Sequence, residues 1–403
     1  MEFVLAILYV AYLSLDTVLT AAQIAFVKQA RGAKPALLPV ADWQKAADYE
    51  VACLRFSIGS NIFSTLILAL WFLAGFSALD QAIAIDSATA KAAAFVASFL
   101  AIGAILNLPL EYYKTFAIDE KFGFNRSTKK LFFIDFVKGL VMLIVVASIL
   151  SCAFAFIARS FAPPLNFSGV FYAFAAAITF IILVNLLFPY IARIFNKFEP
   201  IDDTPLGAKI KELLARAGFG ANGVFRIDAS KRDARLNAYF AGIGKTKRVA
   251  LYDTLIEKLS ESEILAVLGH ELGHFKHKDI WKRLCAIGVE IWVICLFFYA
   301  LLDFDLYSAL NLPQGAHIAM ALCVVFAAPI DFFFQPLINA ISRRAEFAAD
   351  AYGAALTDKT DLKNALVKLA VENRAFPRKL PIYALWRETH PGVLTRIERL
   401  TNG

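Results

Sequence analysis

The sequence predicts a mainly α-helical membrane protein, in which a bundle of seven transmembrane helices carries an α+β domain built from two polar segments. Three observations predict this fold class. The 403-residue chain is 59% hydrophobic and 19% charged, whereas soluble domains are about 45–50% apolar and about 25% charged. Seven apolar runs are long enough to cross a bilayer as helices, which takes about 20 residues. Two long polar segments accompany these runs, one between the fifth and sixth runs and one after the seventh.

The seven apolar runs define the expected spans and the division of the chain. The spans are 3–27, 56–79, 92–110, 133–158, 166–192, 284–302 and 317–341. We therefore expect 1–192 to hold the first five helices with their loops, and 282–341 to hold helices six and seven. The segments 193–281 and 342–403 would form the polar domain.

Lysine and arginine concentrate in alternate loops. Loops 28–55 and 111–132 carry five each, whereas loops 80–91, 159–165 and 303–316 carry one, one and none. Positive residues remain in the cytoplasm during membrane insertion. The N-terminus is therefore expected outside, and the C-terminus and both polar segments inside.

The remaining composition argues against several other classes of protein. Positive residues flank the apolar runs, so the net charge of +7 indicates membrane orientation and no nucleic-acid partner. The five cysteines are odd in number and form no CxxC, so we expect small hydrophobic side chains, neither disulfides nor a zinc site. The first run is preceded by Glu2, whereas a cleavable signal peptide begins with basic residues. We therefore expect this run to be retained as a membrane helix.

Three acidic residues fall inside the apolar runs, namely Asp16, Glu290 and Asp331. Carboxylates within a membrane are costly and often functional. Because no paired base is visible in the sequence, we favour hydrogen bonds in helix packing, or positions near the interface, over a functional role.

The first polar segment alternates between helical and strand patterns. An amphipathic helix is predicted over 206–219, and β-rich runs follow at 223–230, 236–243 and 247–256. Turn residues between these runs favour a small hairpin or meander. A second helix is predicted over 260–279, beginning at the capping residue Ser260. The second polar segment is helical by pattern.

The helix over 260–279 contains the stretch "VLGHELGHFKHKD", which holds three of the chain's five histidines. His270 and His274 are four residues apart, so both lie on one helix face and can bind one zinc ion. Glu271 lies about 100° round the helix, where it can act as general base toward a water. Gly273 is a poor helix former, which fits a helix that another element approaches closely. A chance occurrence of this pattern is the less favoured alternative.

Tetrahedral zinc needs a third protein ligand. His277 and Asp279 are near in sequence, but their spacing from His274 carries them off the metal face. Glu346 in "SRRAEFAAD" is the better candidate. Asp350 lies four residues later on the same face and can accept a hydrogen bond from a ligating histidine, most simply His270. The alternative is a solvated helix with an acidic face.

Three stretches together resemble the type I CAAX prenyl proteases, which are zinc-dependent membrane proteases that convert the yeast a-factor precursor. They are "HELGH", "EFAAD" and the loop "EYYKTFAIDEKFGFNRST" at 111–128. The loop is more particular to that family than the zinc motif. The resemblance covers nearly the whole chain and implies a zincin-like domain beside a water-filled chamber enclosed by the seven helices.

The resemblance also implies roles for individual residues. One zinc ion per chain would be held by His270, His274 and Glu346, with Glu271 catalytic. In "LNAYFAG", Asn237 and Ala238 would hold the substrate backbone by strand addition.

The C-terminal stretch "THPGVLTRIERL" resembles the family's His-Pro segment. There, His390 would donate a hydrogen bond to the oxyanion of the tetrahedral intermediate, and Arg396 would brace it or bind substrate.

The predicted function is that of an integral-membrane zinc endopeptidase. It would cut CAAX-type, prenylated or other membrane-associated polypeptides near their C-termini, as a monomer. The compact chain and its tail without a retention signal favour a bacterial inner membrane with the site facing the cytoplasm, the endoplasmic reticulum being the alternative.

Two other functions compete with this prediction. One is membrane-protein quality control without prenyl specificity. The other is a seven-span metal transporter, which is less favoured because the histidines and carboxylates lie in flanking helices, away from the middle of the bilayer.

Overall fold

Seven helices of the structure are long and apolar enough to cross a membrane, as the sequence predicts. The computed structural model describes residues 2–161, 166–241, 247–303 and 306–402. The spans are α1 (Glu2–Arg31), α2 with its continuation α3 (Val40–Leu70 and Phe76–Ala82), α4 (Ala88–Tyr113), α5 (Lys129–Ser160), α6 (Phe167–Phe195), α10 (Asp279–Asp303) and α12 (Ala316–Leu356).

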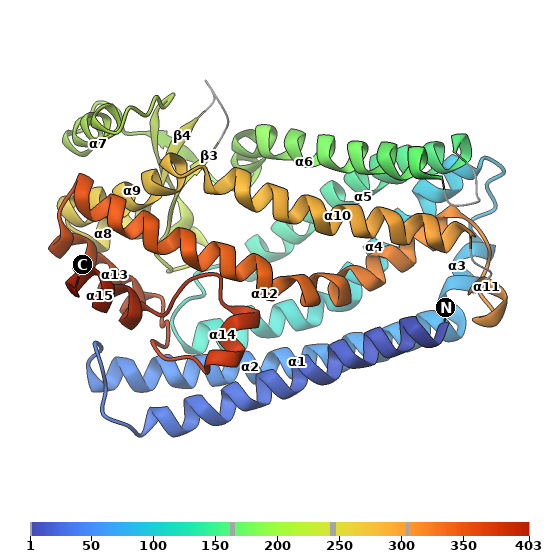
Figure 1. The fold of residues 1–403 in the computed structure, drawn as a ribbon, viewed down its shortest axis with the longest axis horizontal. Helices are drawn as coiled ribbons and strands as arrows, with labels where there is room; N and C mark the ends of the chain where they lie inside the picture. Colours follow the sequence, from blue (N-terminus) through green and yellow to red (C-terminus); the bar gives the residue numbers. More distant parts are fainter. Residues whose placement is uncertain (1, 162–165, 242–246, 304–305, 403) are drawn as a thin grey trace.

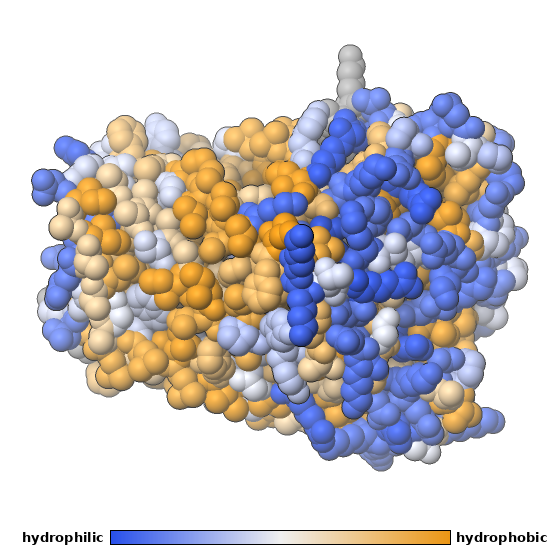
Figure 2. Space-filling view, turned by 180° about the vertical axis from the view of Figure 1, so that it is seen from behind, coloured by the Kyte–Doolittle hydropathy of each residue, from blue (hydrophilic) through white to orange (hydrophobic). Residues whose placement is uncertain are grey.

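These helices run roughly along one direction, and the two termini lie at opposite ends of the molecule (Figure 1). Several helices extend beyond the predicted spans because their polar ends continue into the other part of the protein. Figure 2 shows polar residues gathered over the end that carries the C-terminus and apolar residues over much of the remaining length. This distribution is the one expected for a protein with one part in the bilayer and one part in water.

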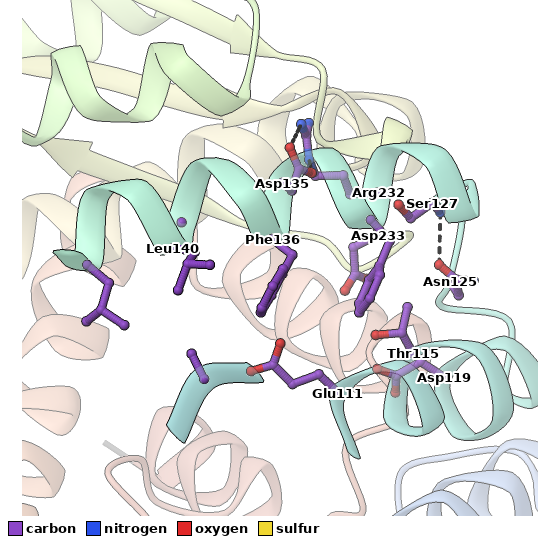
Figure 3. A pocket seen from close by; sticks show the side chains of 14 residues that line it. Glu111, Thr115, Asp119, Asn125, Ser127, Asp135, Phe136, Leu140, Arg232 and Asp233 are labelled. Carbon is purple, nitrogen blue, oxygen red and sulfur yellow. Dashed lines mark hydrogen bonds and ion pairs between the residues drawn. The ribbon is translucent and has the colours of Figure 1, made fainter. Parts of the chain in front are cut away.

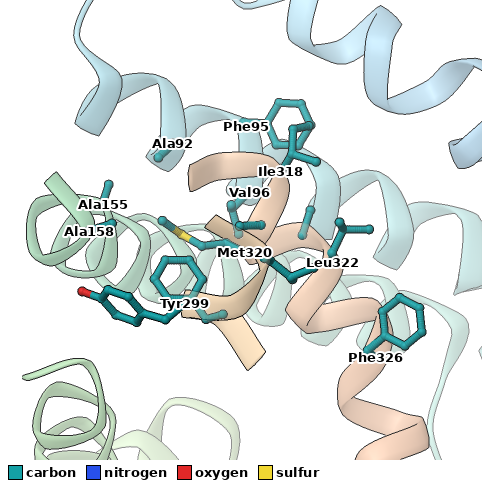
Figure 4. Packing of buried hydrophobic residues seen from close by; sticks show 14 of the residues in the cluster. Ala92, Phe95, Val96, Ala155, Ala158, Tyr299, Ile318, Met320, Leu322 and Phe326 are labelled. Carbon is teal, nitrogen blue, oxygen red and sulfur yellow. The ribbon is translucent and has the colours of Figure 1, made fainter. Parts of the chain in front are cut away.

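The membrane part is held together by a core near the end opposite the C-terminus. Phe95 of α4, Tyr299 of α10 and Ile318 of α12 are fully buried there (Figure 4). Small residues of α5, Ala155 and Ala158, let that helix approach closely. The enclosed chamber implied by the family resemblance stays a prediction.

The polar part contains a sheet of four strands in the order β1-β2-β4-β3. The strands are β1 (Phe198–Pro200), β2 (Val224–Ile227), β3 (Ala238–Ala241) and β4 (Arg248–Tyr252). The predicted hairpin is confirmed, because β3 and β4 pair antiparallel. The alternative of a meander is wrong, because β2 pairs parallel with β4. The buried β4 takes the inner position, which leaves β3 with a free edge.

Six helices of the described chain complete the polar part. They are α7 (Pro205–Arg216), α8 (Asp253–Lys258), α9 (Glu261–Lys276), α13 (Lys359–Glu372), α14 (Pro381–Arg387) and α15 (Val393–Asn402), while the short α11 (Leu306–Ala309) lies at the other end of the molecule. Within the polar part, α8 and α9 pack directly on the sheet. Ser260 caps α9 through a capping box with Glu263, as its sequence indicates. Leu268 and Leu272 of α9 pack in the same core as Leu213 of α7 and Leu251 of β4.

Helices α9 and α12 cross at very small separation. A Cβ atom on Gly273 would lie 2.7 Å from the Ala349 Cα atom, and one on Gly353 would lie 2.7 Å from the His270 nitrogen. Gly273 therefore has the close neighbour that its position in the motif predicts. α12 runs without a break past position 341, where the predicted domain division falls, so that division stays a prediction.

We expect Gly273→Ala to force α9 and α12 apart, since the added methyl group meets backbone atoms. Overpacking of this kind costs about 1–3 kcal/mol. Thermal unfolding of purified protein should shift to lower temperature, and bound metal should fall. Gly288→Ala is the matched control, because a Cβ atom there meets nothing within 4 Å. Equal stability and metal content in both variants would contradict this account.

Candidate metal centre and active site

Three side chains from two helices converge at the crossing of α9 and α12. His270 and His274 come from α9, and Glu346 comes from α12. One ligand atom from each lies within 4.8 Å of the other two. The Nε2 atom of His270 lies 3.5 Å from Glu346 Oε2, and the Nε2 atom of His274 lies 3.3 Å from Glu346 Oε1.

These separations suit a metal ion. Ligand atoms about 2.0–2.1 Å from a tetrahedral zinc ion lie roughly 3.3 Å from one another. Glu346 is buried, and its Oε2 atom has no hydrogen-bond partner among the described residues. The Arg396 Nη1 atom lies 3.3 Å from this oxygen and supplies charge but no hydrogen bond, so a cation bound between the three side chains would further compensate for the burial of the carboxylate.

The electrostatics of His274 also favour a cation. Burial opposes a positive charge on its ring, but the hydrogen bond and charge of Glu346, with Glu271 and Asp279 nearby, outweigh burial and raise its pKa to about 9. A site that retains a proton so strongly is a site of negative potential, and a metal ion can take the place of that proton.

The imidazole ring of His270 is oriented by a buried pair of charges, Asp350 and Arg396. His270 Nδ1 lies 2.8 Å from Asp350 Oδ1, so its Nε2 atom is directed toward Glu346. Arg396 of α15 donates to both oxygens of Asp350, at 2.6 and 2.8 Å. Arg396 is only 7% exposed. This burial favours a bracing role for Arg396 over direct contact with a substrate.

A residue set aside in the sequence analysis occupies the equivalent position for the other histidine. Asp279, at the start of α10, places Oδ2 3.2 Å from His274 Nδ1. It is not one of the three clustered ligands, as its spacing predicts, but it can fix the tautomer of His274. The sequence signal for this orienting role is that Asp279 lies only five residues after His274.

Glu271 faces a cavity beside the three clustered side chains. The cavity has a volume of about 290 Å³, and its lining includes Tyr239 and Phe240 of β3. Burial raises the pKa of Glu271, partly offset by the neighbouring histidines. A carboxylate with a raised pKa is better suited to accept and return a proton near neutral pH.

His390 lies at the rim of the same cavity, in the segment between α14 and α15. Its Nε2 atom lies 3.2 Å from Glu346 Oε1, while 62% of its side chain is exposed. The part of the ring that is shielded from water lowers the pKa of His390, which favours the neutral imidazole. The C-terminal segment therefore brings to the centre a histidine that lies more than 100 residues after the two histidines of α9 in sequence.

β3 is the edge strand of the sheet and can accept an added peptide strand. Asn237 immediately precedes this strand and Ala238 begins it, but the cavity is lined by the two residues that follow, Tyr239 and Phe240. Asn237 is exposed, and its side chain accepts from the Ala238 nitrogen.

The loop that carries the family resemblance holds the chain just before β3. The Arg126 nitrogen donates to the Arg232 oxygen, and the Ala234 nitrogen donates to the Phe124 oxygen. Arg232 also makes a two-pronged ion pair with Asp135 of α5, at 2.7 and 3.0 Å, beside a second cavity of about 480 Å³ (Figure 3). The loop thus fixes the approach to the edge strand, although it contributes nothing to the metal centre.

The segment before His390 is anchored to the membrane helices. Arg387 pairs with Asp16 of α1, which is 1% exposed, and Asn61 of α2 donates to the same carboxylate at 2.7 Å. Arg343 of α12 donates to the main-chain oxygen of Glu388 at 2.7 Å. The expected packing interaction of Asp16 is therefore present, but its partner lies 371 residues further along the chain. Asp331 accepts hydrogen bonds from Gln335, one turn later on the same helix.

Comparisons with known proteins agree with this arrangement. Residues 200–403 match the model of peptidase family M48, and residues 27–197 match the CAAX prenyl protease N-terminal domain of five membrane helices. The CAAX prenyl protease 1 homolog of Dictyostelium discoideum is 35% identical over 320 residues, which are 76% of this chain and 72% of that protein. CAAX prenyl protease 1 of Saccharomyces cerevisiae is 29% identical, and the match covers 89% of this chain and 85% of that protein.

A solved structure extends the similarity to the whole fold. The crystal structure of S. mikatae Ste24p superposes with a TM-score of 0.90 at 27% identity, and the match covers 99% of this chain and 98% of that one. Fold and site thus define an integral-membrane metalloprotease that acts on peptide or protein substrates. The chain belongs to peptidase family M48. The family resemblance is confirmed, and the transporter hypothesis loses its basis.

We expect Asp350→Asn to weaken metal binding by about 10–100-fold, because His270 loses its orienting carboxylate and Arg396 loses its partner. Competition with a chelator would measure the affinity. Asp203→Asn, at an exposed position, is the control. An unchanged affinity would contradict the orienting role.

We expect Asp16→Asn to retain metal but to lower peptide hydrolysis about tenfold, since the segment carrying His390 loses its anchor while the ligands keep theirs. Metal content and hydrolysis would be measured on the same preparation. Asp331→Asn is the matched control, because it also removes an intramembrane charge, yet its hydrogen-bond partner lies on its own helix. The same loss in both variants would show that the anchor is not specific.

Proposed function

We propose that the protein is a zinc metalloendopeptidase that cuts membrane-associated polypeptides close to their C-termini. The observation that carries the proposal is the convergence of His270, His274 and Glu346, with Glu271 facing the adjoining cavity. Two imidazoles and one carboxylate form a donor set typical of catalytic zinc, which leaves one coordination position for water or substrate. One zinc ion per chain would be held.

Glu271 acts as general base and then as general acid. Zinc, when bound, polarises the scissile carbonyl and lowers the pKa of water toward about 7. Glu271 accepts a proton from the attacking water and returns it to the leaving amine. Its burial supports this role, because the raised pKa brings its two protonation states closer in energy near neutral pH.

The surrounding residues position the substrate and the developing charge. The substrate backbone pairs with the free edge of β3, beginning at Asn237 and Ala238, beside the cavity that Tyr239 and Phe240 line. His390 donates a hydrogen bond to the oxyanion. Asp350 orients His270, and Arg396 braces Asp350.

The substrates are CAAX-type polypeptides with a C-terminal prenyl group. Support comes from the relatives, which are described as CAAX prenyl proteases, and from a site that lies at the polar end of a membrane bundle. A lipid-anchored peptide would be held at that level of the bilayer. Quality control of membrane proteins without prenyl specificity is the second candidate, favoured by the exposed His390 and the open edge strand.

The charge distribution supports a site that faces the cytoplasm. This holds for the bacterial inner membrane, where quality control without prenyl specificity would be the function, and equally for the endoplasmic reticulum membrane, where prenylated substrates are available. We also propose that the protein is a monomer within the bilayer, because the metal ligands and the edge strand all come from one chain.

We expect Glu271→Gln to retain zinc and to lose about 10²–10⁴-fold in hydrolysis of a farnesylated C-a-a-X peptide. Glu261→Gln, at the exposed start of the same helix, should remain active. The same peptide without its farnesyl group should be cut poorly.

Two results would change the proposal. Equal cleavage of both peptides would make the lipid incidental and favour quality control. A protein that contains no zinc and cuts neither peptide would contradict the proposed chemistry.

A further inference from the structure

A third cavity adjoins the candidate active site and has no role in the chemistry described above. Its volume is about 840 Å³, and it shares His390 with the cavity that Glu271 faces. Its walls come from α12 and from the segments 375–379 and 390–395. A chain that leaves the active site past His390 therefore reaches this cavity next.

The lining of the cavity carries more positive than negative side chains. The acidic lining residues are Glu388 and Glu398, and the basic ones are Arg343, Arg344, Arg378 and Lys379. Among the residues that the structure describes, carboxylates neutralise the lysine alone of these four basic side chains. Lys379 lies 2.8 Å from Glu50 and 3.3 Å from Glu388.

In the part of the chain that the structure describes, the three arginines form no ion pair. Arg343 donates to the main-chain oxygens of Ala384 and Glu388, at 2.9 and 2.7 Å, which fixes its guanidinium group. Arg378 lies over the ring of Trp43, 5.5 Å from its centre. Arg344 is exposed. The cavity thus offers a surplus of positive charge to an anionic group.

The wall of the cavity and the metal centre lie within one turn of α12. Arg343 lies three residues before Glu346, which is a rise of about 4.5 Å along the helix axis. Three extended residues span roughly 10 Å. A peptide whose scissile bond lies beside Glu271 can therefore carry a C-terminal carboxylate into this cavity when only a few residues follow the bond.

We infer that this cavity binds the C-terminal carboxylate of the substrate. Arg344 and Arg378 supply charge-assisted hydrogen bonds, and Arg343 holds the wall between cavity and metal centre in place. The inference rests on the proposed peptidase function and deepens it, because it names the group that positions a substrate whose scissile bond lies near its C-terminus.

The test measures binding, so it does not depend on turnover. The Glu271→Gln protein in phosphatidylcholine nanodiscs is titrated into two fluorescein-labelled farnesylated peptides, which differ only in a C-terminal carboxylate or amide. Fluorescence anisotropy gives the two Kd values. We expect the carboxylate peptide to bind about tenfold more tightly. When Arg344→Gln and Arg378→Gln are both introduced into this Glu271→Gln protein, the Kd values of the carboxylate and amide peptides should become equal.

Arg226→Gln is the matched control, because it removes an exposed arginine of β2 outside the cavity, and it should keep the tenfold preference. Equal affinities before the arginines are changed, a preference that survives their loss, or no binding of either peptide would overturn the inference. A preference that disappears in phosphatidylglycerol nanodiscs would assign the cavity to lipid headgroups and also overturn it. Absence of hydrolysis by the unsubstituted protein, with the binding preference intact, would reject only the proposed function.

Discussion

The contact between α9 and α12 is the constraint on which the rest of the site depends. Two histidines lie on one helix and a glutamate lies on the other, so the metal centre exists only while the two backbones stay close. Gly273 and Gly353 make that approach possible, since a Cβ atom at either position would meet backbone atoms. The same crossing brings Asp350 to His270. One packing event therefore assembles ligands and orienting groups together.

Buried polar contacts join the membrane part to the C-terminal segment. An aspartate inside the bundle is expensive to desolvate unless a partner compensates for it. Asp16 meets Arg387 and Asn61, and Gln23 of α1 accepts from the Leu380 nitrogen at 2.8 Å. These contacts fix the segment that ends in His390. The membrane helices thus position part of the site as well as holding the protein in the bilayer.

Much of this structure is predictable from the sequence, because the decisive signals are local. Apolar runs of sufficient length predict the spans, and the four-residue spacing of His270 and His274 places both on one face. Glu346 and Asp350 share the same spacing on α12. Such periodic signals survive without any knowledge of tertiary contacts.

The features that the sequence does not predict depend on long-range geometry. The parallel pairing of β2 with β4 follows from how the chain crosses the sheet, which short strands do not encode. The three-residue β1 is too short to have a pattern. The partner of Asp16 is 371 residues away, and the role of Asp279 depends on the turn between α9 and α10.

The unbroken course of α12 has a mechanical consequence. With 41 residues it is about 62 Å long, roughly twice the thickness of the hydrocarbon layer. Its first half packs in the membrane core, and its second half carries Glu346 and Asp350. Pro329 and Pro336 lie between these two halves, and each removes a main-chain hydrogen bond and favours a bend in the helix. The membrane half can thus follow the bilayer through the bend, while the glycine contact with α9 preserves the mutual geometry of the catalytic groups.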